Sequence, residues 1–109
     1  MNHPELFGTR RRTQVLEVLA LMEESHAREV ATLLGTPVRT IQRIIEKLEL
    51  EGIVVGRTVG RERRLELNRR YFAYNELRQL LIKVAMRDQE VDDLVSALRR
   101  RPRQKGKAL

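Results

Sequence analysis

The sequence predicts a mainly α-helical fold that carries one small β-hairpin. Three segments before residue 52 have apolar residues at helical spacing, and a glycine follows the second and the third of them. Residues 53–67 instead alternate well enough for two strands, and their two glycines suit a ribbon with a tight tip. Beyond residue 68 the helical spacing returns. The length of 109 residues is typical of a single domain.

The first helix is expected to begin after Thr9, a plausible N-cap, and to end at about Glu24. Residues 1–8 have no period and are expected to form an arm. Arginines 10–12 fall in the first helical turn, where the helix dipole disfavours cations. Either a nearby anion or solvation accounts for them, and solvation is the simpler reading. The inward stripe of this helix comprises Val15, Leu16, Val18, Leu19 and Met22.

A helix-turn-helix is predicted next. Residues 25–27 form a short link that could include a brief strand, and residues 28–34 form the second helix, which Gly35 ends in a left-handed conformation. Thr36 is expected to cap the third helix, with Pro37 at its first position. Because only two or three residues separate the two helices, they must cross rather than run on.

The third helix, from about 37 to 51, has one apolar and one polar face. Its inward stripe is Ile41, Ile44, Ile45 and Leu48. Arginine can form two hydrogen bonds with guanine, and glutamine can do the same with adenine. The polar face could therefore read DNA bases, although an ordinary solvated face has the same pattern. Expected base-reading residues are Arg39, Gln42 and Arg43, and expected backbone contacts are Thr36, Thr40 and Lys47.

The hairpin predicted over about 53–67 is rich in arginine. Arg57, Arg61, Arg63 and Arg64 cluster around Gly60. A narrow minor groove attracts inserted arginine, and phosphates attract the rest. Because strand alternation sends neighbouring residues to opposite faces, the four side chains cannot all contact DNA. The strongest candidate is Arg61 at the tip, and simple solvation is the alternative.

Composition limits the other classes of function. The net charge is +7, with six basic residues in 99–107 and a further six, against two acidic, in 57–70. Such local basicity is typical of surfaces that face phosphate. There is no Cys and no apolar run of about 18 residues, so no disulfide, thiolate metal site or membrane span is expected, and a cytoplasmic location fits. With two histidines and no phosphate-binding loop, catalysis is not indicated.

Residues 70–101 are predicted to be helical and to form a dimerisation unit, followed by a disordered basic tail, 102–109. Apolar residues recur at intervals of seven positions, so one long helix is possible. Two helices with a break at 87–89 are favoured, with Asp88 as a cap. Self-association would bury the apolar stripes, and core packing within one chain is the alternative. The expected dimerisation residues are Leu77, Leu80, Leu81, Val84, Val91, Leu94, Val95 and Leu98.

Residues 1–69 would then be the DNA-binding unit. The segments LFGTRRRTQVLEVL (6–19), TPVRTIQRIIEKLELEGIV (36–54) and VGRERRLELN (59–68) resemble winged helix-turn-helix transcriptional regulators of the arsenic-repressor (ArsR-like) type, with MarR-like regulators as close relatives. The resemblance implies a homodimer that binds double-stranded DNA, usually as a repressor. By it the base-reading positions are Val38, Arg39, Gln42 and Arg43.

The chain departs from the metal-sensing members of that group, because the Cys pairs and His/Asp sets that they use are absent. Metal-responsive release is therefore not implied, no cofactor is expected, and any small-molecule effector is unknown. Two other classes remain open. A winged domain can serve as a protein-interaction module or a nonspecific nucleic-acid accessory, and such a module should present a more apolar face on the third helix. RNA binding should instead expose aromatic side chains for base stacking, and Tyr71, Phe72 and Tyr74, which follow the hairpin, are expected to pack.

Overall fold

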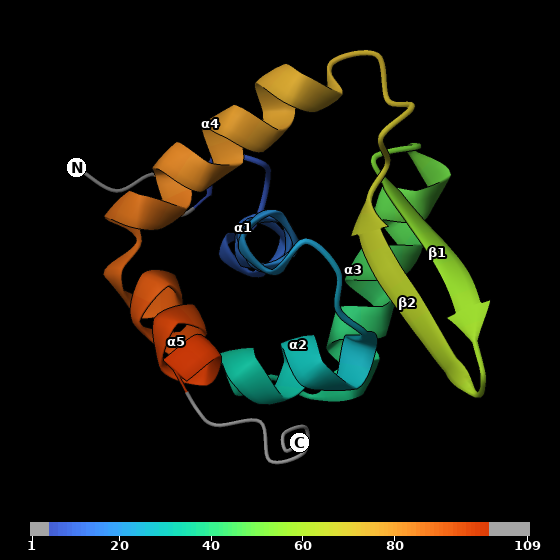
Figure 1. The fold of residues 1–109 in the computed structure, drawn as a ribbon, viewed down its shortest axis with the longest axis horizontal. Coiled ribbons are helices and arrows are strands. Elements are labelled where there is room, and N and C mark those ends of the chain that lie inside the picture. The colour runs from blue at the N-terminus through green and yellow to red at the C-terminus, as the bar shows by residue number, and fades with distance from the viewer. Residues whose placement is uncertain (1–4, 101–109) are drawn as a thin grey trace.

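The computed structural model describes residues 5–100, and the side chains of residues 5–98. The predicted tail, 102–109, and the first four residues of the arm lie outside this range. Within it the chain is mainly helical, with one two-stranded antiparallel sheet. This arrangement is compatible with a winged helix (Figure 1). The elements in order are α1 (Arg10–Met22), α2 (Ala27–Leu34), α3 (Val38–Leu50), β1 (Val54–Val59), β2 (Glu62–Leu67), α4 (Tyr74–Arg87) and α5 (Gln89–Arg100).

Helix α1 is the centre of the fold. Figure 1 shows it end-on, with α4, α5, α2, α3 and β2 arranged around it. Thr9 caps it as predicted, because its side chain accepts a hydrogen bond from the Arg12 backbone N–H. The predicted apolar stripe is buried, with Met22 only half-buried. Helix α1 is buried on all sides and not only along this stripe, since every residue from 13 to 20 is buried.

The three arginines at the start of α1 have partners within the chain, which for Arg11 is the side-chain oxygen of Gln14 and for the other two is a carboxylate. Arg10 lies 2.6 Å from a Glu90 carboxylate oxygen on α5, and Arg12 contacts Glu51 at the end of α3. Arg12 also donates to the Phe7 carbonyl at 2.8 Å. The anions that offset the unfavourable dipole are therefore the protein's own carboxylates, whereas solvation was the expected explanation.

The helix-turn-helix forms as expected, with small differences at its boundaries. Gly35 has φ +60° and ends α2 in the left-handed conformation. The expectation that Thr36 caps α3 is wrong. Pro37 occupies the cap position, and the Thr36 hydroxyl donates to the Leu34 carbonyl at 3.1 Å. The cap of α2 is His26, whose Nδ1 accepts from the Glu29 N–H at 3.3 Å.

The hairpin begins after Gly52, which has φ +78°. Its strands are longer at the tip than the predicted 53–57 and 63–67, because Val59 pairs with Glu62 and only two residues form the turn. The brief strand expected at the 25–27 link is present as a single bridge between Ser25 and Leu65. This bridge fixes the base of the hairpin beside the end of α1.

The C-terminal region forms two helices, and the break lies at Asp88 as expected. The Asp88 carboxylate accepts from the Val91 N–H at 3.4 Å, so it caps α5. Three of the predicted dimerisation residues, Leu81, Val91 and Val95, are instead in the core of the same chain, at 0, 0 and 3% exposure. The expectation that they face a second chain is wrong. They are covered because α4 and α5 fold back onto α1 (Figure 1).

Two carboxyl groups meet in the interior where α1 packs against the α4–α5 junction. Glu17 is fully buried and Asp88 is 7% exposed. No donor in the described part of the chain reaches either Glu17 oxygen or Asp88 Oδ2. Burial first, and then hydrogen bonding with Asp88 and its charge, raise the pKa of Glu17 to about 8, against the opposing charge of Arg10. A hydrogen bond between the two carboxyls therefore requires a proton on one of them.

Across residues 5–100, none of the helices combines the length and the hydrophobicity needed to cross a lipid bilayer.

Candidate nucleic-acid interface

The polar face of α3 is exposed along its whole length. Arg39, Gln42 and Arg43 are all exposed, and so are Thr40 and Lys47. The apolar side of the same helix seals the core through Ile41, Ile45 and Leu48, which explains why the polar side must face outward. The described residues provide no carboxylate partner for Arg39, Arg43 or Lys47.

Two of the residues predicted to contact DNA are less accessible than expected. Val38 is half-buried and packs against the core, so little of its side chain remains for a base. Thr36 is half-buried in the turn, where its hydroxyl is already a donor to Leu34. The exposed polar face of α3 therefore begins with Arg39.

The hairpin arginines divide into two classes. Arg61 lies in the two-residue turn, is exposed, and has no carboxylate partner in the described chain. Arg57, Arg63 and Arg64 each contact at least one glutamate. Sequence reasoning anticipated that neighbouring strand residues face opposite ways, and the structure confirms it for Arg63 and Arg64.

One face of the hairpin is held against the end of α1. Arg64 lies 3.1 Å from Glu24 and 3.2 Å from Glu62. Arg57 lies 3.5 Å from the same Glu24 and 3.8 Å from Glu66. The two guanidinium groups therefore share Glu24, and their charge is largely balanced within the fold.

The other face is held against α3. Arg63 makes two hydrogen bonds with the Glu49 carboxylate, at 3.0 and 2.6 Å. The hydrogen bond to Glu49 raises the pKa of Arg63. Its guanidinium lies directly over Gly56, since a Cβ built at that position would be 2.7 Å from the guanidinium carbon. A side chain at residue 56 would displace Arg63, so the glycine permits the close approach.

A hollow of about 540 Å³ separates α3 from β2 and opens onto this surface. Arg61, Arg63 and Gln42 line it together with three carboxylates, Glu46, Glu49 and Glu62. On the α2 side, His26 Nε2 lies 2.9 Å from a Glu62 oxygen. The surface is thus a mixture of charges. Its cations without a carboxylate partner among the described residues include Arg28, Arg39, Arg43, Lys47 and Arg61.

Sequence reasoning missed the glutamates that hold the hairpin. The sequence did not single out Glu24 or Glu49, because their arginine partners are 40 and 14 residues away along the chain. The one local signal was the alternation of glutamate with arginine inside the hairpin itself. His26 was noticed only as a residue without a catalytic partner, and its capping role depends on a helix start one residue earlier than expected.

The predicted dimerisation residues that remain accessible lie on the outer sides of α4 and α5. Leu80 is 45% exposed, and Val84, Leu94 and Leu98 are half-buried. Leu77 is half-buried and packs against the core. An apolar hollow of about 530 Å³ between α2 and α5 includes Leu94 and Leu98.

No protein-family model matches this sequence, and no curated protein is significantly similar to it.

Proposed function

We propose that this chain binds double-stranded DNA in a sequence-specific manner and regulates transcription, as a homodimer. Helix α3 would enter the major groove, and the β1–β2 hairpin would contact the minor groove and the phosphates. The observation that carries the proposal is one exposed surface. On it, Arg39, Gln42 and Arg43 lie on the outer face of a crossing helix pair, beside a hairpin with the unpaired Arg61 at its tip.

The dimensions and chemistry of this surface suit a duplex. Helix α3 has 13 residues, which corresponds to a rod about 20 Å long. A major groove about 12 Å wide accepts a helix of this kind. The unpaired arginines on α3 have the geometry for two hydrogen bonds to guanine, and Gln42 has the geometry for adenine. The paired arginines of the hairpin would then shape the surface and would not carry most of the affinity.

The protein-interaction alternative is less well supported on this face. The exposed middle of α3 is formed by charged and amide side chains, and its one highly exposed aliphatic residue, Leu50, is at the last position. An interface core between proteins is typically depleted in such charges and enriched in aromatics. The expectation that Phe72 packs is wrong, because it is 91% exposed, but it follows β2 and is not on α3.

The direct test is selection of bound fragments from genomic DNA, followed by titration of the best fragment against a scrambled duplex at about 0.15 M salt. Sequence-specific regulators typically prefer their site by about 10³-fold or more. Arg43→Ala should lower that ratio by about 5- to 150-fold, because a bidentate contact discriminates bases by about 1–3 kcal/mol. Arg87→Ala, an exposed arginine at the end of α4, is the matched control. Equal affinity for selected and scrambled DNA would contradict the proposal.

A further inference from the structure

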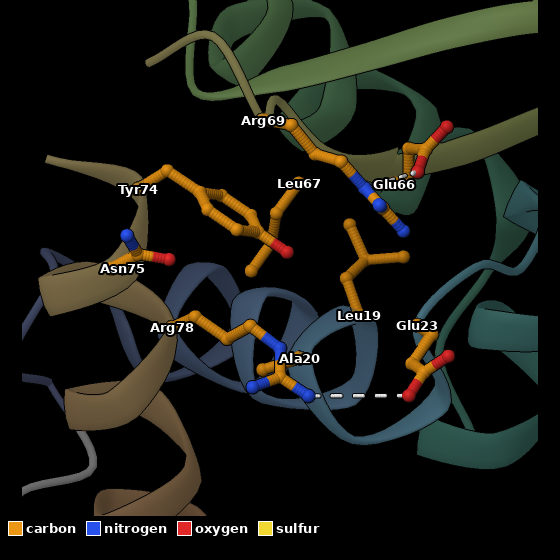
Figure 2. Close-up of a pocket in the computed structure, with 9 residues that line it drawn as sticks. All are labelled: Leu19, Ala20, Glu23, Glu66, Leu67, Arg69, Tyr74, Asn75 and Arg78. Carbon is orange, nitrogen blue, oxygen red and sulfur yellow. Dashed lines mark ion pairs between the residues drawn. The ribbon is translucent and has the colours of Figure 1, made fainter. Parts of the chain in front are cut away.

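A third hollow, of about 260 Å³, lies between α1, β2 and α4 and shares no residue with α3 (Figure 2). Its floor is apolar: Leu19 and Ala20 from α1 and Leu67 from β2 are buried. The ring of Tyr74, from the first turn of α4, extends across it. The volume is just below the 300 Å³ at which ordinary small-molecule sites begin. Only a small ligand could be enclosed.

Two arginines approach this floor from opposite sides, as Figure 2 shows for Arg69 and Arg78. Arg69 lies 3.8 Å from Glu66, and Arg78 lies 3.9 Å from Glu23. Both distances exceed hydrogen-bond length, so neither contact engages the N–H donors of the guanidinium. Each arginine is held near the hollow by charge and still has its donors available.

The first turn of α4 adds further unused groups at the same place. No side chain caps this turn. The Tyr74 N–H donates to the Tyr71 carbonyl at 2.9 Å, which leaves the backbone N–H groups of Asn75 and Glu76 without a partner in the described residues, at the positive end of the helix dipole. In the described chain, neither the Tyr74 hydroxyl nor the Asn75 amide side chain has a hydrogen-bond partner. This side of the hollow is therefore suited to a carboxylate.

Two carboxylates also line the hollow, each beside one of these arginines. The only partners of the Glu23 and Glu66 carboxylates in the described residues are arginines at 3.8 Å or more. Glu23 has φ +73°, the only positive φ outside glycine among residues 5–100. That conformation is disfavoured by about 1–3 kcal/mol and places this carboxylate at the end of α1, on the rim.

We propose that the hollow binds a small zwitterion, namely an α-amino acid with an apolar side chain. A simple anion would be repelled by two carboxylates, and a simple cation by two guanidiniums, whereas a dipolar molecule satisfies both pairs. The ligand carboxylate would accept from Arg69, Arg78 and the first turn of α4. Its ammonium group would face Glu23 and Glu66, and its side chain would cover Leu19 and Leu67.

The test is a titration of the full-length protein with each probe, monitored by NMR through the backbone amide resonances of Tyr74 and Asn75. The probes are L-leucine, its decarboxylated amine 3-methylbutylamine and its deaminated acid 4-methylpentanoate, with L-phenylalanine and its two analogues as a second set. At least one amino acid should give saturable shifts, and its amine and acid should each bind about tenfold more weakly or worse, since each lacks one charge-assisted set of bonds.

Arg78→Gln should weaken that binding by about tenfold or more, and Arg87→Gln, on the last turn of the same helix, should leave it unchanged. Arg69→Gln provides a second variant at a highly exposed position, where folding is not at risk. Three results would overturn the proposal: no saturable shift with either amino acid up to about 10 mM, an acid or an amine that binds as tightly as its amino acid, or unchanged binding in both arginine variants. None of them depends on whether the protein binds DNA.

Discussion

Both oxygens of the Glu49 carboxylate accept hydrogen bonds from Arg63, so the second strand of the hairpin is tied to the helix beside it. The contact crosses Gly56, which has no side chain to obstruct it. An acidic residue of α3 thus occupies the guanidinium that a DNA phosphate would otherwise attract. If the surface binds DNA, Glu49 competes with the duplex for Arg63.

Replacing this glutamate should therefore strengthen DNA binding. In Glu49→Gln the fold loses one exposed ion pair, so the free energy of unfolding should change by no more than about 1 kcal/mol. Arg63 becomes available to a phosphate, and the slope of log affinity against log salt should steepen by about 0.9. The measurement is a salt series of DNA titrations with both proteins.

The matched control is Glu76→Gln, which removes the same charge from the exposed first turn of α4. If both variants steepen the slope equally, the effect comes from net charge and not from Arg63. A slope that stays unchanged in Glu49→Gln would show that Arg63 is a brace for the hairpin and does not contact phosphate.

The buried pair of Glu17 and Asp88 predicts an unusual dependence of stability on pH. The pKa of Glu17 is raised from 4.5 to about 8, so the folded state binds a proton that the unfolded state releases above pH 4.5. The stabilising contribution is therefore complete below pH 4.5 and is lost as the pH rises to about 8. Over that interval the free energy of unfolding should fall by about 1.4 kcal/mol per pH unit from this group.

Glu17→Gln should abolish that decline, because an amide stays neutral and can donate to the Asp88 carboxylate. Urea denaturation from pH 5.5 to 8.5 should show the variant more stable than the original protein at the alkaline end, with the two converging toward the acid end. Parallel curves across this range would mean that Glu17 is ionised in the folded protein at all of these pH values.

The features that the sequence predicted are mainly those that neighbouring residues determine, whereas the features that it missed depend on tertiary packing. The caps at Thr9 and Asp88, the left-handed Gly35 and the break between α4 and α5 are set by neighbouring residues, and the sequence predicted them. The burial of Glu17 could not be seen, because a single apolar stripe on α1 gave no sign that α4 and α5 would enclose its polar side. The carboxylate partners of the hairpin arginines were hidden for the same reason, since Glu24 and Glu49 are brought there by tertiary packing.

The division between paired and unpaired arginines predicts unequal effects in the hairpin. Arg61→Ala should reduce the salt slope of DNA binding by about 0.9, because this unpaired cation is free to contact a phosphate. Arg64→Ala should change the slope much less, since Glu24 and Glu62 already balance its charge. Salt series on the two variants compare an unpaired with a paired arginine, and each substitution removes one positive charge. A larger effect from Arg64→Ala would mean that the ion pairs open on binding.

Substitutions at two neighbouring leucines on α4 test folding and self-association separately. Leu81 is fully buried within one chain, so Leu81→Ala should lower the free energy of unfolding by about 2–5 kcal/mol. Leu80 is 45% exposed, and Leu80→Asp should leave the folded chain nearly as stable. If the two chains of the proposed homodimer associate through the outer side of α4, Leu80→Asp should shift sedimentation toward the monomer. Unchanged sedimentation in that variant would move the contact between chains away from this side of α4, for instance toward Leu94 and Leu98 on α5, because a buried carboxylate without a partner is too costly to keep in an interface.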